Sequence, residues 1–132
     1  KDPRMAYGNV QDSVGNLMRA FRDLHMHVLF LCKEAVINDD GVLKHAPKMV
    51  GQQLGETVTY FFDEVLALRI IEDQDEEGRN TRNRWLQTVY GQGYKAKDRS
   101  GKLDDFERPD ISALIEKLGF SLTNITKGES NE

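Results

Sequence analysis

Cysteine, proline and long apolar runs are all scarce in this 132-residue sequence, which has one cysteine and three prolines. Because Cys32 stands alone, no disulfide can form within the chain, and we expect a reducing, cytoplasmic setting. No apolar stretch approaches the roughly 20 residues that span a bilayer, so no contact with a membrane is expected. With 39% hydrophobic and 30% charged residues, the composition is that of one globular domain with a real core.

Several motifs that mark common sites are also missing. No G-x-x-x-x-G-K-[ST] loop occurs, so the sequence has no phosphate-binding loop of the P-loop kind. The stretch 91–96, GQGYKA, loosely matches a dinucleotide fingerprint, but the polar residues after it predict no helix there. His25, His27, His45 and Cys32 lack any standard zinc spacing, and we expect no metal site. The isolated chain is therefore predicted not to hydrolyse ATP.

The pattern of apolar residues predicts helices mixed with strands. Helical spacing indicates helices over 7–24 and 49–62, and a third that begins at the N-cap Asp110 and ends at Gly119. The alternating run 84–90 predicts a strand that forms a hairpin with 64–71. Between the first two helices, 37–48 contains an Asp-Asp-Gly turn signal and is expected to be a loop or a short hairpin.

The fold class predicted from these elements is α/β. The continuous apolar run 28–31 predicts a central strand, with Val65, Ala67 and Leu68 in the strand beside it, because such runs are typical of parallel sheets covered on both faces. The chain opens on a helix and has no obvious first strand. We therefore expect residues 1–122 to be part of a larger fold and residues 123–132 to be a polar tail.

The first predicted helix carries an apolar face made of Val14, Leu17, Met18 and Phe21. These residues would pack on strands that this sequence does not supply. Leaving several of them in water is costly, since burying one large apolar side chain is worth roughly 1.5–3 kcal/mol. We expect this face to be covered by a second chain or by an exchanged copy of the same chain, which makes a homo-oligomer the expected state.

Charge is distributed unevenly along the chain, whose formal net charge is -4. Five acidic residues fall within 72–77, whereas 79–102 holds seven cations and the single carboxylate Asp98. Four of the cations, Lys95, Lys97, Arg99 and Lys102, lie close to Gly101 in a short polar stretch. This stretch is either a solvated turn or an anion site, for which phosphate is the most plausible ligand.

The residues K-D-R-S-G at 97–101 resemble the Lys-x-Arg-x-Gly element near the end of RecA-like ATPase cores, including hexameric helicases. The order of the surrounding segments is similar as well. Residues 16–34 resemble the helix and strand that follow the magnesium-binding strand in that fold, 50–70 resemble the next helix and strand, and 84–104 resemble the closing hairpin. The resemblance spans 7–118 and is closest to phage RecA-like proteins of recombination and single-strand annealing. The family's phosphate-binding loop and magnesium-binding strand are absent here.

This resemblance implies a role in trans, as the C-terminal part of an ATP-binding protein. Lys97 and Arg99 take the positions that reach the γ-phosphate of a neighbouring subunit's nucleotide, and Gly101 permits the tight turn. Lys33 and Glu34, at the end of the predicted central strand, match the position of a nucleotide-sensing residue, although the family usually has Gln or His there. ATP and Mg²⁺ are the implied cofactors of the full assembly, with none expected for the isolated chain.

The segment 38–48 lies where RecA-like proteins carry DNA-contacting loops. Lys44, His45 and Lys48 are therefore the candidate contacts to single-stranded DNA, and binding through so few phosphates would be modest and salt-dependent. An alternative function remains open on the sequence alone: a stand-alone α/β module that binds a protein or nucleic acid without nucleotide chemistry.

Overall fold

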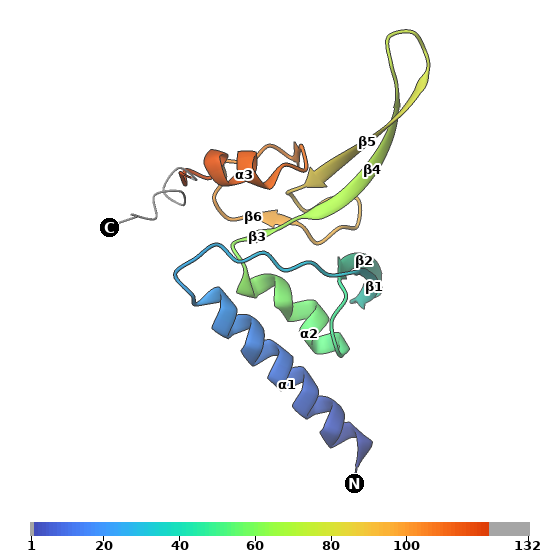
Figure 1. The fold of residues 1–132 in the computed structure, drawn as a ribbon. Coiled ribbons are helices and arrows are strands. Elements are labelled where there is room, and N and C mark those ends of the chain that lie inside the picture. The colour runs from blue at the N-terminus through green and yellow to red at the C-terminus, as the bar shows by residue number, and fades with distance from the viewer. Residues whose placement is uncertain (1, 122–132) are drawn as a thin grey trace, which may run out of the picture.

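The computed structural model describes residues 2–121, and the predicted polar tail 123–132 lies outside the described residues. The fold is mixed α/β, as predicted (Figure 1). The helices are α1 (Pro3–Arg22), α2 (Gln52–Thr57), the 3₁₀ helix η1 (Val58–Phe61) and α3 (Ile111–Lys117). The strands are β1 (Glu34–Asp39), β2 (Val42–Pro47), β3 (Glu64–Val65), β4 (Ala67–Gln74), β5 (Asn80–Gln87), β6 (Lys97–Asp98) and β7 (Phe106–Glu107).

Helix α1 begins and ends with ordinary helix signals. The Asp2 carboxylate caps the first turn by accepting a 2.9 Å hydrogen bond from the Arg4 amide, and Pro3 occupies the first helical position. Arg19 and Arg22 lie in the last turn, where cations stabilise the negative end of the helix. The helix predicted over 7–24 is therefore confirmed, with an earlier start.

The main core lies between α1 and the α2–η1 segment (Figure 1). Its buried residues are Met18, Leu54 and Val58, and Val14 and Phe30 are among the half-buried side chains that pack against them. The helix predicted over 49–62 is present but short, and it tightens to a 3₁₀ turn after Thr57. This core joins the helices to the extended segment that follows α1.

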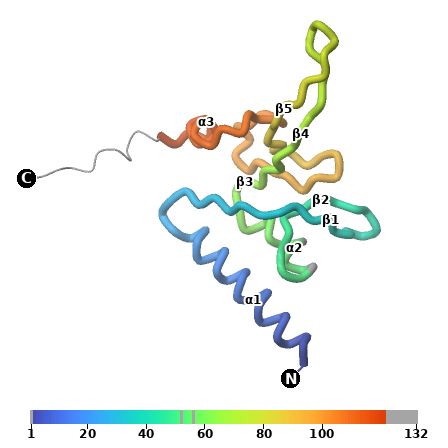
Figure 2. Tube along the Cα trace, turned by 45° about the vertical axis from the view of Figure 1, so that its right-hand side comes forward, coloured from blue at the N-terminus to red at the C-terminus, as the bar shows by residue number. Residues whose placement is uncertain are grey.

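The sheets are small, and every strand pair in the described residues is antiparallel. β1 pairs with β2, β3 with β6, and β5 lies between β4 and β7. The β4–β5 hairpin predicted from 64–71 and 84–90 is confirmed, and its ladder continues to the pair Gln74 and Asn80, so that it projects far from the helices (Figures 1 and 2). The predicted parallel sheet is not found within 2–121.

The central strand predicted at 28–31 is wrong. Residues 27–33 are extended, but no backbone hydrogen bond joins 27–32 to any other described residue. Phe30 faces the core, with its ring 5.8 Å from that of Phe21, whereas Leu29 and Leu31 are exposed. Val65 and the Ala67–Leu68 pair do lie in strands, yet these pair with β6 and β5 and not with 28–31. Residues 28–31 are apolar like those of a central strand, but no described strand pairs with them.

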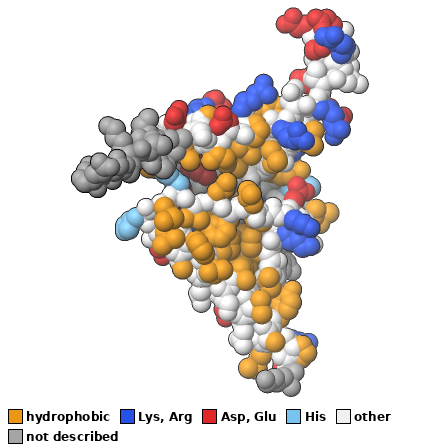
Figure 3. Space-filling view, in the orientation of Figure 1, with side chains coloured by type: hydrophobic (Ala, Val, Ile, Leu, Met, Phe, Trp, Pro, Cys, Tyr) orange, Lys and Arg blue, Asp and Glu red, His pale blue; other side chains and the backbone are white. Residues whose placement is uncertain are grey.

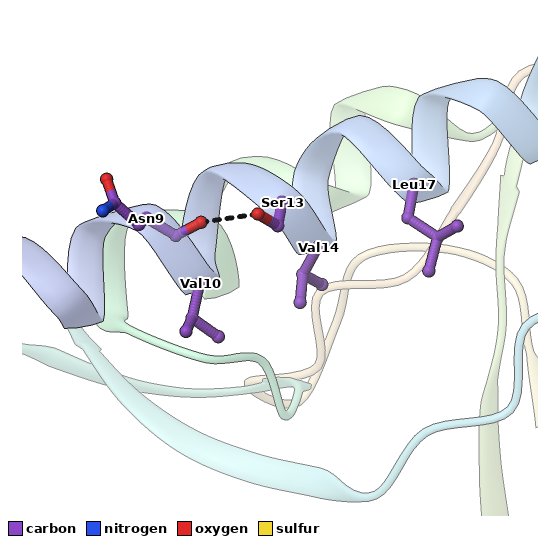
Figure 4. A pocket seen from close by; sticks show the side chains of 5 residues that line it. All are labelled: Asn9, Val10, Ser13, Val14 and Leu17. Carbon is purple, nitrogen blue, oxygen red and sulfur yellow. Dashed lines mark hydrogen bonds between the residues drawn. The ribbon is translucent and has the colours of Figure 1, made fainter.

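The apolar face of α1 is covered only in part. We expected a second chain or an exchanged copy to cover this face, but Met18 is buried and Val14 packs on the core within the chain itself. Leu17 and Phe21 remain 56% and 42% exposed. Apolar side chains gather on the surface over this helix (Figure 3), and Val10, Val14 and Leu17 project from one side of it to line an open hollow (Figure 4).

The β1–β2 hairpin and α3 follow their sequence signals. Asp40 and Gly41 both have positive φ, as a two-residue type I′ turn requires, which settles the predicted loop or hairpin at 37–48 as a hairpin. The Asp110 carboxylate accepts a 3.1 Å hydrogen bond from the Ala113 amide at the start of α3. Gly119, with a φ of 99°, follows the end of this helix as predicted.

Candidate phosphate-contact site on strand β6

The short β3–β6 pair places Lys97 and Arg99 on one face. Val65 lies opposite Lys97 and Glu64 lies opposite Asp98 in the antiparallel register. The pairing continues past the strand end, because the Arg99 amide donates a 3.1 Å hydrogen bond to the carbonyl oxygen of Asp63. Since side chains alternate between faces along a strand, Lys97 and Arg99 share one face and Asp98 points to the other.

The turn after β6 is organised by the Asp98 carboxylate. Its Oδ1 accepts hydrogen bonds from the Ser100 amide at 2.7 Å and the Ser100 hydroxyl at 2.5 Å, and its Oδ2 accepts one from the Leu103 amide at 2.9 Å. Gly101 has a φ of 68°, a conformation that favours glycine. Burial would raise the pKa of Asp98, but its hydrogen bonds with Ser100 and Leu103, together with the neighbouring Glu64, hold the pKa at about 2. The turn is therefore held in shape by its own hydrogen bonds, while residues 99–102 are exposed to solvent.

Lys97 and Arg99 lie close enough to repel each other. Burial lowers the pKa of Lys97, and the Arg99 guanidinium lowers it further, while Asp63 and Glu64 partly offset the effect. The Lys97 ammonium lies 5.9 Å from the ring centre of Tyr60, and Arg99 forms a 2.7 Å ion pair with Asp63. Because two cations on one face disfavour each other, an anion placed between them would be stabilised.

The other two cations of the 94–105 stretch are held elsewhere. Lys95 forms a 3.1 Å ion pair with Asp39 of the β1–β2 hairpin. Lys102 donates a 2.6 Å hydrogen bond to the Leu118 carbonyl oxygen at the end of α3, where a helix attracts cations. The four cations that the sequence places together therefore do not form one cluster, and the candidate anion site reduces to Lys97 and Arg99.

The predicted sensing residues lie at the start of β1. The Lys33 carbonyl oxygen accepts a 2.7 Å hydrogen bond from the Lys48 amide, and the Glu34 carboxylate lies 2.6 Å from Nδ1 of His45. In the described part of the chain, no hydrogen bond or ion pair joins Lys33 or Glu34 to Lys97 or Arg99. Glu34 is instead part of a contact that ties the ends of β1 and β2 together.

The candidate DNA contacts are largely engaged within the protein. Lys44 forms a 2.8 Å ion pair with Asp39, which raises the pKa of Lys44. The His45 ring stacks on the Tyr94 ring, with centres 4.3 Å apart and planes at 10°. The Lys48 amide belongs to the backbone link described above. These contacts show how the three residues are held in the fold.

A network around Tyr94 was not predicted from the sequence. The Arg69 guanidinium lies 4.0 Å from the centre of the Tyr94 ring and donates a 2.5 Å hydrogen bond to Oε1 of Gln87. Gln87 is 2% exposed, and its Nε2 donates to the carbonyl oxygens of Val89 and Gly91. This network connects the β1–β2 hairpin to the β4–β5 hairpin and fixes the loop that leads into β6. Its members lie far apart in the sequence and share no motif spacing.

A comparison of the sequence with protein-family models identifies the family of this chain. The AAA domain family matches residues 2–100, three quarters of the chain, and the matched segment contains Lys97 and Arg99. The chain therefore belongs to the AAA domain family, a family of nucleotide-binding, ATPase-type domains. A search of curated proteins and a search of solved structures each returned no match.

The described residues fit only part of what a bound nucleotide requires. Within 2–121, no three His, Cys, Asp or Glu side chains come together in a way that could hold a metal ion. The hollow on α1, and a second one between α1 and α2–η1 that includes Gln11 and Arg19, contain neither Lys97 nor Arg99. The donor set of β6 suits contact with phosphate oxygens and does not suit a magnesium site. No described helix is long and apolar enough to cross a membrane.

Proposed function

We propose that this chain is the C-terminal part of a phage-type RecA-like ATP-binding protein that acts in DNA recombination or single-strand annealing. In this proposal Lys97 and Arg99 contact the γ-phosphate of a nucleotide bound by a neighbouring subunit. The observation that carries it is the placement of these two cations on one face of β6, beside a turn that Asp98 holds in shape.

The chemistry of phosphoryl transfer supports this role for Lys97 and Arg99. Negative charge builds up on the transferred phosphoryl group, and a positioned guanidinium and ammonium neutralise it without further rearrangement. A planar guanidinium forms paired hydrogen bonds with phosphate oxygens, which an ammonium cannot do. Arg99 therefore takes the finger role and Lys97 supplies a second charge. Bound ATP with Mg²⁺ would supply the phosphoryl group that these residues contact.

The unpaired segment at 27–32 supports the placement of this chain within a larger sheet. Its backbone donors and acceptors pair with no described residue, and Leu29 and Leu31 on the outward side are 58% and 88% exposed. A strand that is apolar on both faces suits the centre of a parallel sheet. We propose that β-strands of the remaining ATPase core occupy both of its edges and cover Leu29 and Leu31.

Single-stranded DNA and further copies of the chain are the proposed partners. The DNA proposal rests on the β1–β2 hairpin and the residue after it, where Lys44 and Lys48 supply positive charge and His45 lies between them in the chain. Their internal contacts allow few free phosphate contacts, so we expect weak and strongly salt-dependent binding. A trans role for Arg99 requires at least two subunits.

The proposal is tested by ATP hydrolysis in two preparations. The 132-residue chain alone is expected to show none, because none of its described residues cradles the β- and γ-phosphates. In the assembled ATPase that contains the chain, we expect Arg99→Ala to lower kcat by about 10³-fold, the scale of an arginine finger. The control is Arg82→Ala, since Arg82 is an exposed cation that pairs with Glu72 on the hairpin. Turnover by the isolated chain that is lost in Lys97→Ala or Arg99→Ala would place the active site within this chain and refute the trans role.

The exposed apolar face of α1 favours one alternative, an interaction module without nucleotide chemistry. Leu17 and Phe21 belong to this face, and it includes the hollow shown in Figure 4. Unchanged ATPase kinetics in Arg99→Ala, together with binding of a protein to this face, would support the module instead.

A further inference from the structure

Two carboxyl groups face each other on the side of the β3–β6 pair opposite Lys97 and Arg99. Glu64 lies directly across from Asp98 in the register. Residues paired in this way have Cβ atoms about 4.5–5.5 Å apart, which brings their side chains into contact. The Asp98 carboxylate already accepts three hydrogen bonds from the turn, so it is the better candidate to carry the negative charge.

Glu64 is the group whose environment does not suit an anion. Its Oε2 is buried and has no hydrogen-bond partner. A buried carboxylate oxygen without a donor is costly, and a second carboxylate beside it adds repulsion. A proton on Glu64 removes both problems at once, because the protonated oxygen becomes a donor and Asp98 is an acceptor.

The charged groups around Glu64 are consistent with a proton on its carboxyl group. Asp98 lies opposite Glu64, and Asp63 precedes it in the chain, so both disfavour a second negative charge. Lys97 and Arg99 are the cations nearby, but they lie on the other face of β6 and Arg99 is paired with Asp63. Burial and the neighbouring Asp98 carboxylate raise the pKa of Glu64 to about 7, against the opposing effect of the Ser100 backbone amide.

We propose that Glu64 is a positioning residue for the phosphate-contact site: its protonated carboxyl donates a hydrogen bond to Asp98 and so fixes the turn that presents Lys97 and Arg99. Loss of this proton places two carboxylates against each other and loosens the hold of Asp98 on the Ser100 and Leu103 amides. The positions of the cations then change with pH near neutrality. The link to catalysis rests on the proposed function, whereas the coupling between Glu64 and the turn does not.

The coupling is tested by nuclear magnetic resonance of the 132-residue chain, with side-chain carboxyl and backbone amide signals followed from about pH 5 to about pH 9, the range that brackets a group titrating near neutrality. We expect the Glu64 carboxyl to titrate near pH 7 and the Ser100 and Leu103 amide signals to shift with the same midpoint. Titration of Glu64 at its ordinary value, about 4.3, would overturn the proposal. The proposal would also be overturned if the Ser100 and Leu103 amide signals did not shift as Glu64 titrates.

Variants separate positioning from simple packing. Glu64→Gln keeps a neutral donor of similar shape, so it should retain the amide positions and abolish their shift near neutrality. Glu64→Ala removes the donor and should displace the Ser100 and Leu103 signals at every pH. The matched control is Glu72→Gln on the exposed part of β4, which should leave the neutral transition unchanged. Equal behaviour of the Gln and Ala variants would refute the hydrogen bond to Asp98.

A second arm measures ATPase activity of the assembly against pH. We expect kcat of the wild type to fall severalfold as the pH rises through neutrality, and kcat of Glu64→Gln to stay level over the same range. If the amide shifts occur but the two activity profiles are alike, the positioning holds and the trans role of Lys97 and Arg99 fails. If the amide shifts are absent, the inference fails whatever the activity shows.

Discussion

Arg99 is joined to Asp63 through both its backbone and its side chain. The Arg99 amide donates to the Asp63 carbonyl oxygen at 3.1 Å, and Nη1 donates to the Asp63 carboxylate at 2.7 Å. The backbone hydrogen bond fixes the position of the Arg99 main chain, and the ion pair orients its exposed side chain. The Asp63 carboxylate thus holds the Arg99 guanidinium in place through Nη1 and leaves its other N–H groups to bind an anion.

Removing this ion pair should affect the site more than the fold. The side chains of Arg99 and Asp63 are 61% and 75% exposed, and such pairs contribute little to stability. We expect Arg99→Ala to change the free energy of unfolding by no more than about 0.5 kcal/mol, measured by urea denaturation, while weakening binding of inorganic phosphate to the chain. Arg82→Ala is the matched control and should leave phosphate binding unchanged. A large loss of stability in Arg99→Ala would mean that Arg99 supports the fold rather than a ligand.

The two facing carboxyl groups should give the chain an acidic stability optimum. The pKa of Glu64 is raised to about 7, so its contribution is full below its ordinary value and is lost as the pH rises through 7. The pKa of Asp98 is lowered to about 2, so its contribution is present above its ordinary value of 3.8 and is lost as the pH falls toward 2. Stability should therefore be greatest at mildly acidic pH and fall by roughly 1 kcal/mol as the pH rises from the ordinary pKa of a glutamate through 7, after allowance for solvent screening.

Urea denaturation at a series of pH values measures this profile. Glu64→Gln should remove the fall toward neutral pH and keep the fall in acid. A wild-type profile that stays flat through neutral pH would contradict the assignment of a proton to Glu64.

Gln87 is expected to be the most sensitive polar residue of the fold. Its side chain is 2% exposed, and it accepts a hydrogen bond from Arg69 and donates two to the 89–91 loop. Gln87→Ala removes these three hydrogen bonds of a buried side chain, which costs roughly 2–3 kcal/mol in thermal or urea unfolding. Gln92→Ala removes one exposed hydrogen bond to Arg69 and should cost far less. Equal costs for the two variants would show that the Tyr94 network does not hold the hairpins together.

The exposed apolar residues of α1 predict that the chain associates with itself or with further strands. We expect size-exclusion chromatography with light scattering to show more than one chain per particle at micromolar concentration. Leu17→Glu should reduce association, because it places a charge on the uncovered face. Leu43→Glu should not, because it changes a residue on β2 that is at least as exposed but lies outside that face. A stable wild-type monomer would contradict this account of the α1 face.

Local signals in the sequence were enough to predict most elements. The caps at Asp110 and Gly119, the Asp-Asp-Gly turn and the alternating pattern of 84–90 all depend on neighbouring residues, and each predicted element is present. The strand at 28–31 failed because hydrogen bonding in a sheet depends on a partner strand, which an apolar run cannot specify. Phe30 of this run packs on the core, whereas Leu29 and Leu31 are exposed, so burial on both faces stays a prediction.

The candidate site could be predicted only in part for a related reason. The K-D-R-S-G stretch pointed to Lys97 and Arg99 because its residues are contiguous. It could not show that Lys95 and Lys102 bind Asp39 and Leu118, since these contacts depend on how distant segments pack. Glu64 was missed for the same reason, because its significance comes entirely from the strand register that places it opposite Asp98.

The trans action of Arg99 is tested most directly by mixing two inactive forms of the assembled ATPase. One form carries Arg99→Ala, and the other has an intact β6 element but an inactivated phosphate-binding loop. If Arg99 acts on a neighbour's nucleotide, mixed assemblies contain interfaces with one intact loop and one intact arginine, and ATP hydrolysis returns to a measurable fraction of the wild-type rate. If Arg99 acts within its own subunit or does not contact nucleotide, mixing restores no activity beyond that of the separate forms, and the central claim is contradicted.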